Sequence, residues 1–343
     1  MASKGGVLED YEWERLPDMA TPRCYSVAAY HEGKLYVLGG CEKEGKPINE
    51  AEVYSFADKK WTALPPMPRN RAACTKAIVR ENKIYLVGGV TDKQATVPEV
   101  DCFDIDSQKW SQIAPLPKGV VGPYIALVDD KIYVLGGTDK IDCNQSVAYD
   151  FDRGVWLALP DKPTSCYSCG GYVHDRKVYV VGGRDGKKPV QAMEMFDLDT
   201  QQWEELTPMV SVRVFYNVIG IKDEIYVVGG LVPLVGVCKV VEKYSIHDDM
   251  WSRVKDMQEI RSDAGYGVVG GRLVVAGGLG GDKLRPMNTS EAFRYQGKRF
   301  HSLPPLVTER SSMTSLMFDG RLAVLNGVGE GGVQAIVEVL CKK

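Results

Sequence analysis

A pair of adjacent glycines recurs along this 343-residue chain at intervals of 46 to 49 residues. The pairs are Gly39-Gly40, Gly88-Gly89, Gly136-Gly137, Gly182-Gly183, Gly229-Gly230 and Gly277-Gly278, with a degenerate seventh copy at Asn326-Gly327. A period of this size that fills the chain predicts a repeat architecture, because one such unit cannot bury its apolar face alone. The repeat therefore constrains the fold more than any local propensity does.

Each repeat carries the same signals in the same order. An apolar run such as residues 34–38 ends at the glycine pair, and glycine lets the chain turn with positive φ and a neighbouring backbone approach closely. After a loop comes an aromatic residue, and seven positions later a second one. These aromatic pairs are Tyr54/Trp61, Phe103/Trp110, Tyr149/Trp156, Phe196/Trp203, Tyr244/Trp251 and Phe293/Phe300. The fixed spacing predicts a hairpin of fixed register, and four antiparallel strands per unit predict a propeller blade.

The two ends of the chain predict how the repeat array closes. Trp13 lies 26 residues before Gly39 with no glycine pair ahead of it, so it marks a fourth strand without its first three. The last unit, ending at residues 337–340, is three strands that lack a fourth. We therefore expect the N-terminal strand to complete the last blade, which removes an open sheet edge.

The predicted fold is an all-β, seven-bladed propeller over residues 11–341, preceded by a short polar segment, residues 1–10. Its expected blades are residues 21–66, 69–116, 118–160, 164–208, 211–257, 261–304, and 306–341 together with 11–17.

Composition indicates the cellular compartment and the classes of binding partner to expect. The chain is 44% hydrophobic with a net charge of −3, so it carries no basic excess for nucleic acid or an acidic membrane. No signal peptide is visible, and no apolar stretch approaches the ~20 residues of a membrane helix. Nine cysteines, an odd number, suit a reducing compartment. We expect a cytoplasmic, monomeric protein that binds neither nucleic acid nor membrane.

Candidates for catalysis or metal binding are few. The four histidines fall in different repeats. Cys166 and Cys169 form a C-x-x-C pattern, but a zinc site needs two more ligands at matching spacing, and a thioredoxin-like pair needs a helix start. In a strand, moreover, two thiols three residues apart point to opposite faces. We therefore expect structural cysteines, no catalytic residue, no metal site and no cofactor.

Two charged columns follow the repeat. The acidic column stands two positions before the first aromatic of each pair, with Val147 as the exception: Glu52, Asp101, Glu194, Glu242, Glu291 and Glu338. The basic column lies 16 residues before the glycine pair, or 17 for Arg71, with Gly119-Val120 and Ser165-Cys166 as exceptions: Arg23, Arg71, Arg213, Arg261 and Arg310. We interpret the acidic column as structural. The arginines open the innermost strands and are expected to ring one channel mouth, with Arg184 on the same face.

The glycine pairs, the aromatics and Trp61, Trp110, Trp156, Trp203 and Trp251 at these distances resemble the kelch motif. The stretch 178–190 and residues 193–198 are similar to the kelch domain-containing protein 8 group. The resemblance implies a cytoplasmic protein-interaction module with a role in cell division. Some family members carry an added BTB domain, whereas here we expect a propeller alone.

In kelch proteins that bind short acidic peptides, arginines at equivalent positions grip the carboxylates beside serine and tyrosine hydroxyls. The resemblance thus implies a partner-binding set of Arg23, Arg71, Arg184, Arg213, Arg261, Arg310 and Tyr25. Guanidinium forks suit carboxylates and phosphates, since they form bidentate, charge-assisted bonds. A second interpretation remains open, in which the arginines cap backbone carbonyls or pair with the acidic column.

Two functions follow. The first is a non-catalytic scaffold or recruiting subunit that docks an acidic or phosphorylated segment of a partner protein. The second is a propeller enzyme of the sugar mutarotase or metal-dependent lyase type, in which channel-mouth arginines hold a small anionic substrate. We favour the first.

Overall fold

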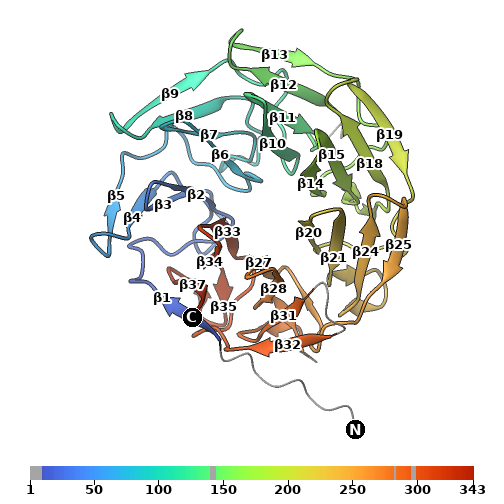
Figure 1. Ribbon diagram of the computed structural model, residues 1–343. Helices are drawn as coiled ribbons and strands as arrows, with labels where there is room; N and C mark the ends of the chain where they lie inside the picture. The colour runs from blue at the N-terminus through green and yellow to red at the C-terminus, as the bar shows by residue number, and fades with distance from the viewer. Residues whose placement is uncertain (1–9, 140–143, 282, 295–298) are drawn as a thin grey trace. The chain divides into compact units, whose positions relative to one another are not determined.

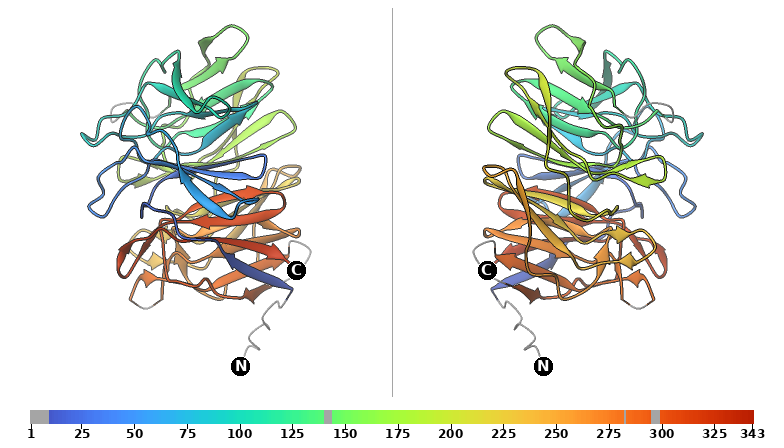
Figure 2. Two further views of the ribbon diagram at one scale, coloured as in Figure 1. Left: turned by 90° about the vertical axis from the view of Figure 1, so that its left-hand side faces the viewer. Right: turned by 90° about the vertical axis from the view of Figure 1, so that its right-hand side faces the viewer.

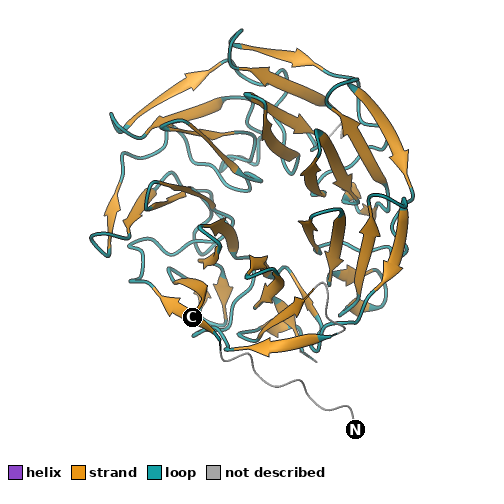
Figure 3. Ribbon diagram, in the orientation of Figure 1, coloured by secondary structure: helices purple, strands orange, loops and turns teal. Residues whose placement is uncertain are grey.

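The computed structural model describes residues 10–139, 144–281, 283–294 and 299–343, and in these ranges it contains strands and loops but no helix (Figure 3). No helix that could span a membrane is therefore found in the described residues. Most of the expected polar segment 1–10 lies outside them. The chain packs as two compact units, one of residues 25–209 and one of residues up to 24 together with 210–343.

The unit of residues 25–209 contains four antiparallel sheets of four strands, each in chain order (Figure 1). Their strands are β2 (Val27–His31), β3 (Lys34–Leu38), β4 (Ala51–Ser55) and β5 (Lys60–Ala63); β6 (Ala77–Arg80), β7 (Lys83–Leu86), β8 (Val100–Asp104) and β9 (Lys109–Ile113); β10 (Tyr124–Val128), β11 (Lys131–Leu135), β12 (Ser146–Asp150) and β13 (Val155–Ala158); and β14 (Gly170–His174), β15 (Lys177–Val181), β18 (Met193–Asp197) and β19 (Gln202–Leu206). A short hairpin, β16 (Arg184–Asp185) and β17 (Lys188–Pro189), follows β15.

The second unit contains three further sheets of four strands. Their strands are β20 (Asn217–Ile221), β21 (Glu224–Val228), β24 (Val241–Ser245) and β25 (Met250–Arg253); β27 (Gly265–Val269), β28 (Arg272–Ala276), β31 (Ser290–Arg294) and β32 (Phe300–Leu303); and β33 (Thr314–Phe318), β34 (Arg321–Leu325), β37 (Val337–Lys342) and β1 (Tyr11–Arg15). Short strands occupy the connecting loops: β22 (Leu231–Val232), β23 (Gly236–Val237), β26 (Arg261–Ser262), β29 (Leu279–Gly280), β30 (Arg285–Pro286), β35 (Val328–Gly329) and β36 (Gly332–Val333).

The N-terminal strand completes the last sheet, as the sequence predicts. Strand β1 pairs antiparallel with β37 from Tyr11↔Lys342 to Arg15↔Glu338, and the two lie side by side in Figure 1 and Figure 2. Trp13 stands opposite Leu340, where the other sheets have an aromatic pair. The described part of the chain thus holds seven four-stranded sheets, one of them built from both ends of the sequence.

All six aromatic pairs have the predicted register. Each pair is directly cross-strand, from Tyr54↔Trp61 to Phe293↔Phe300, with ring centroids 4.9 to 5.3 Å apart. Two of the indole N–H groups reach the preceding sheet: Trp110 donates to the Pro65 carbonyl at 2.9 Å and Trp203 to that of Pro160 at 2.9 Å. These two tryptophans therefore join successive sheets as well as the strands of one hairpin.

The glycine pairs bring successive sheets into backbone contact. Gly39 and Gly40 have φ of 59° and 105°, and the Gly40 N–H donates to the Arg71 carbonyl of the next sheet at 2.9 Å. A Cβ on Gly39 would lie only 2.4 Å from that carbonyl oxygen, so no other residue fits. In the degenerate seventh copy, Asn326 takes the left-handed conformation with φ of 59°, which asparagine tolerates better than most residues.

Candidate functional site

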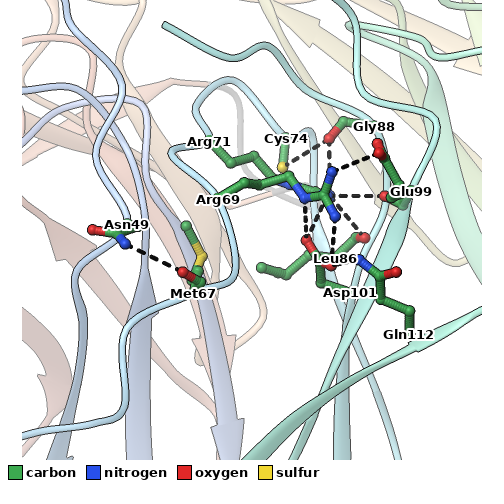
Figure 4. A network of polar contacts seen from close by, with 10 residues as sticks. All are labelled: Asn49, Met67, Arg69, Arg71, Cys74, Leu86, Gly88, Glu99, Asp101 and Gln112. Atoms are coloured by element: carbon green, nitrogen blue, oxygen red, sulfur yellow. Dashed lines mark hydrogen bonds and ion pairs between the residues drawn. The ribbon is translucent and has the colours of Figure 1, made fainter.

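The arginine column lies inside the sheets, as Arg71 illustrates (Figure 4). Its Nη1 donates to the carbonyls of Leu86, at 2.9 Å, and Gly88, at 3.2 Å. Its Nη2 donates to the Glu99 carbonyl at 2.9 Å and forms an ion pair with Asp101 at 2.7 Å. The guanidinium thus caps the ends of strands β7 and β8 and neutralises a buried carboxylate.

The same arrangement recurs in the unit that contains residues 210–343. Arg213 pairs with Glu242 at 2.9 Å, Arg261 with Glu291 at 2.7 Å, and Arg310 with Glu338. All six side chains are 3% exposed or less. Each guanidinium also caps backbone carbonyls; Arg213, for example, donates to those of Gly229, Val240 and Val227. Burial lowers the pKa of Arg310 to about 10, which leaves it charged at neutral pH.

This burial corrects the expectation that the column grips a partner. Every side chain of the set Arg23, Arg71, Arg213, Arg261 and Arg310 is 1% exposed or less. Four of these arginines precede the first long strand of their sheet, but their side chains fold back along that sheet instead of projecting into solvent: Arg71, Arg213, Arg261 and Arg310. For the four arginines with pairs described above, the second interpretation, capping of carbonyls and pairing with the acidic column, is the one the geometry supports.

One sequence signal could have revealed this pairing. The sheet of β10–β13 has Val120 at the arginine position and Val147 at the acidic position, so both charges are replaced together. Both valines are buried in one apolar cluster with Ile132 and Val134. Two columns that lose their charge in the same repeat are typical of residues that pair within that repeat, because an unpaired buried charge is costly.

The sheet of β14, β15, β18 and β19 neutralises its buried carboxylate with a different cation. Cys166 occupies the arginine position, and the cation comes from Lys162, which pairs with Glu194. Both of these charged side chains are 1% exposed. The Lys162 Nζ also donates to the Thr164 carbonyl at 2.6 Å, and the Thr164 N–H donates to Glu194 Oε1 at 2.7 Å.

A second conserved position of the repeat lies two residues after the arginine and has positive φ in every sheet. Its occupants are Tyr25, Ala73, Gly122, Ser168, Phe215, Asp263 and Ser312, with φ between 51° and 65°. Within each unit these residues are linked by backbone bonds, for example from the Asp263 N–H to the Phe215 carbonyl at 3.1 Å. The Ser168 N–H donates likewise to the Gly122 carbonyl at 2.7 Å. This position lies in the loops at one edge of the sheets. The loops that follow the glycine pairs lie at the same edge, and we call this edge of each sheet the loop edge.

The remaining two predicted site residues lie on this loop edge and are accessible. The Tyr25 side chain is 51% exposed. Arg184 is half-buried in the β16–β17 hairpin, with its guanidinium carbon 4.9 Å from the centre of the Tyr167 ring. Lys187 and Lys188, in the same hairpin, are exposed.

Apolar side chains missed as candidates also gather on the loop edge. In the unit that contains residues 210–343, seven of the ten large hydrophobic side chains described as exposed lie in its loops: Val210, Val212, Phe215, Leu234, Val235, Leu284 and Val307. The Leu234 and Val235 side chains, at the tip between β22 and β23, are respectively fully and 80% exposed. Exposed apolar side chains in neighbouring loops are candidates for contact with another protein. No cluster of three or more potential metal-ligating side chains occurs among the described residues.

Two protein-family models and several curated proteins match parts of this sequence. Residues 8–137 match the family model of the KLHDC2/KLHL20/DRC7 Kelch-repeats domain, and residues 165–210 match the Kelch motif. The chain is 34% identical over 169 residues to Kelch domain-containing protein 8B of Homo sapiens, and that alignment covers 46% of this chain and 47% of the relative. It is 25% identical over 195 residues to Kelch-like protein 36 of Mus musculus, covering 53% of this chain and 31% of the relative.

The alignments therefore span about half, or less, of the length of these curated relatives. A solved structure titled "Structure of YjhT" shares the fold, with a TM-score of 0.56 at 16% identity over 94% of this chain and 96% of that one. At this low sequence identity, the structural match supports the fold and nothing about function. Together with the glycine pairs, the aromatic pairs and the four-stranded sheets, these matches show that the chain belongs to the kelch-repeat family.

Proposed function

We propose that this chain is a non-catalytic protein-interaction module, a closed seven-bladed propeller whose loop edge docks a partner protein. The observation that carries the proposal is the concentration of exposed apolar side chains on that edge, above all Phe215, Leu234 and Val235. Large apolar and aromatic side chains at the centre of an interface supply most of its binding free energy. Kelch-repeat relatives support the general class of function.

The β16–β17 hairpin, in the unit of residues 25–209, offers a second docking point with a charge preference of its own. Arg184, Lys187 and Lys188 place three cationic groups against one acidic group, Asp185, within five residues. The Tyr167 hydroxyl donates to the Gly186 carbonyl at 2.8 Å, so the ring beneath the Arg184 guanidinium is fixed to the hairpin. An acidic or phosphorylated segment would bind here by charge-assisted hydrogen bonds. We propose a cytoplasmic scaffold or recruiting subunit, with the role in cell division resting on resemblance alone.

The enzymatic alternative loses its physical basis. A mutarotase or lyase of the kind considered above would hold an anionic substrate with channel-mouth arginines. Arg213 and Arg261 instead have their guanidinium groups buried in ion pairs with Glu242 and Glu291. We therefore propose the interaction module in preference to an enzyme.

The test compares the two edges of the sheets. Affinity capture from cell lysate with the triple variant Phe215→Ser, Leu234→Ser and Val235→Ser should lose most partners of the wild-type chain. The control variant, Val155→Ser with Met250→Ser, removes exposed apolar groups from the hairpins at the opposite edge and should retain them. Equal loss in both variants, or no loss in either, would contradict docking at the loop edge.

The charge of the partner is tested separately. A Lys187→Glu and Lys188→Glu variant should selectively lose partners with acidic or phosphorylated segments, and wild-type capture of these should weaken as salt rises. If the retained and lost partners do not differ in charge, the acidic-segment proposal fails while the interaction module stands.

A further inference from the structure

Two leucines stand at loop tips in a backbone conformation that suits glycine. Leu234 has a φ of 64° and Leu284 a φ of 48°, both in the left-handed region, where a Cβ is sterically unfavourable. Their loops follow the glycine pairs of two neighbouring sheets, those that begin with β20 and β27 (Figure 1). Two adjacent loops of the unit that contains residues 210–343 therefore carry the same unfavourable choice of residue.

The turn at Leu234 shows why glycine would be expected there. The Val235 N–H donates to the Val232 carbonyl at 3.2 Å, which closes a β-turn with Pro233 second and Leu234 third. A positive φ at the third position of a β-turn favours glycine or asparagine, because a larger side chain strains the backbone. Leucine is therefore a costly residue for this turn.

The turn at Leu284 can be compared with its counterparts in other sheets. Leu284 is the fourth residue of a turn, and its N–H donates to the Gly281 carbonyl at 3.2 Å. In the sheet of β2–β5 the counterpart is Gly45, with a φ of 71°, which donates to the Glu42 carbonyl at 2.9 Å. In the sheet of β6–β9 it is Gln94, with a φ of 55°. Neither counterpart is apolar, so the turn itself does not require leucine.

Packing within the chain does not account for the two leucines either. The Leu234 side chain is fully exposed, and that of Leu284 is 52% exposed. A leucine in water adds nothing to the core, and its left-handed backbone weakens the fold. Residues held in unfavourable conformations without a structural return cluster at functional sites.

The backbone that carries Leu234 is fixed before any partner binds. Leu231 exchanges two backbone hydrogen bonds with Val214, at 2.7 and 3.0 Å, and the Cys238 N–H donates to the Gly230 carbonyl at 2.9 Å. Strands β22 and β23 thus form a hairpin whose base is tied to the loop before β20. A loop that is already ordered loses little conformational entropy on binding.

The charges around the two tips do not favour a lipid surface. Six loops of this unit lie at the loop edge, namely residues 210–216, 229–240, 254–264, 277–289, 304–313 and 326–336. Apart from the buried arginines, they contain six acidic residues and only four basic ones, Lys239, Lys255, Lys283 and Arg285. Arg285 is also paired with Glu330 at 3.2 Å. Apolar loops that enter membranes rely on a basic surround that attracts anionic lipids, so a protein is the better partner.

We propose that Leu234 and Leu284 are anchor side chains, each of which enters an apolar pocket on a folded protein partner. The inference rests on the proposed function and adds the shape of the partner. A projecting tip fits a concave surface, which a folded domain offers and an extended segment does not. Burial of the two side chains supplies binding free energy that the free chain forgoes.

The partner is identified by contact. A photo-cross-linking amino acid that carries a diazirine is placed at position 234 of the full chain, which is irradiated in cell lysate, and the cross-linked peptides are mapped. We expect cross-links to apolar residues of one folded domain, which is then purified and titrated against the wild-type chain. Cross-links to an extended acidic segment, or only to a second copy of this chain, would overturn the proposal.

Glycine variants separate binding from stability. Leu234→Gly with Leu284→Gly should raise the urea midpoint of unfolding, because it relieves two left-handed residues, and should weaken binding of the cross-linked domain roughly tenfold or more. Gln94→Gly is the matched control, since it relieves the same strain at an exposed tip of the other unit. It should raise the midpoint without changing the affinity. A lower midpoint in the leucine variant would show that the leucines serve the fold, and would overturn the proposal.

Two further results distinguish this inference from its alternatives. Vesicles of phosphatidylcholine and phosphatidylserine in equal parts should not sediment the chain; sedimentation that the double glycine variant abolishes would make the tips a membrane anchor instead. If the double glycine variant binds the domain like the wild type while Phe215→Ser, Leu234→Ser and Val235→Ser together lose it, the anchors are wrong and the interaction module stands. Equal binding by all three chains would count against both.

Discussion

The sheet of β20, β21, β24 and β25 and the sheet of β14, β15, β18 and β19 hold the same buried carboxylate in two ways. In the first, Arg213 neutralises Glu242 and caps three backbone carbonyls at once. In the second, Lys162 neutralises Glu194 from four residues upstream of the arginine position. Because Lys162 supplies the cation, no arginine is needed four residues later, and Cys166 occupies that position. The repeat thus conserves a charge balance, and not a particular side chain.

The largest effect is expected from breaking an arginine pair. Arg213→Met leaves Glu242 buried with only the Ser211 hydroxyl, at 2.5 Å, as a side-chain partner among the bonds described. We expect a loss of about 3–5 kcal/mol in the free energy of unfolding, measured with urea.

The matched double variant, Arg213→Met with Glu242→Leu, should recover part of this loss, since it imitates the sheet that contains Val120 and Val147. A double variant less stable than the single one would show that the carbonyl caps, rather than the ion pair, dominate.

A smaller loss is expected at the aromatic pairs, which both sheets share. Trp203→Ala removes a ring that is only half-buried, together with its bond to the Pro160 carbonyl. We expect a loss of about 2–3 kcal/mol, below the ~3–5 kcal/mol of a fully buried tryptophan. Trp203→Phe, which keeps the ring stacking but not the bond, should lose about 1 kcal/mol. Equal losses in both variants would mean that the hydrogen bond is the main contribution.

A third change converts the lysine sheet into the arginine kind. Cys166→Arg combined with Lys162→Met should place a guanidinium beside Glu194 and keep the free energy of unfolding within about 2 kcal/mol of the wild type. A severe loss of stability would show that the backbone around Cys166 has diverged too far to accept the arginine.

The smallest effect concerns a carboxylate that has a hydroxyl as its described partner instead of a cation. Asp263 accepts a bond from the Ser312 hydroxyl at 2.5 Å, and burial raises its pKa. A carboxyl whose pKa is higher in the folded than in the unfolded chain stabilises the fold at low pH, and that contribution is lost as pH rises through the folded pKa.

Asp263→Asn should therefore raise the free energy of unfolding slightly at pH 7, by less than about 1 kcal/mol as measured with urea, and bring no gain at low pH. A gain of equal size at both pH values would contradict this explanation.

The fold followed from the sequence because its signals are periodic. Glycine pairs, aromatic spacing and the incomplete ends predicted the strands, the cross-strand register and the pairing of β1 with β37. The site was predicted less well from the sequence. A position at the start of a strand does not determine whether a long side chain such as that of Arg71 extends into solvent or folds back against its own sheet. Residues 166–169 form a turn and not the strand that the sequence predicts at Cys166 and Cys169, and this turn depends on the positive φ of Ser168, which no residue type at that position requires.

The position with positive φ in every sheet has a consequence for how such a chain can diversify. Tyrosine, alanine, glycine, serine, phenylalanine and aspartate all occupy it with nearly the same backbone conformation, although the left-handed region is unfavourable for all of them except glycine. Hydrogen bonds between neighbouring copies hold that conformation independently of the side chain. Mutation can therefore exchange the group displayed there, from an aromatic ring to a carboxylate, without remodelling the loop that presents it. New binding specificity can arise at these points while the scaffold is inherited unchanged.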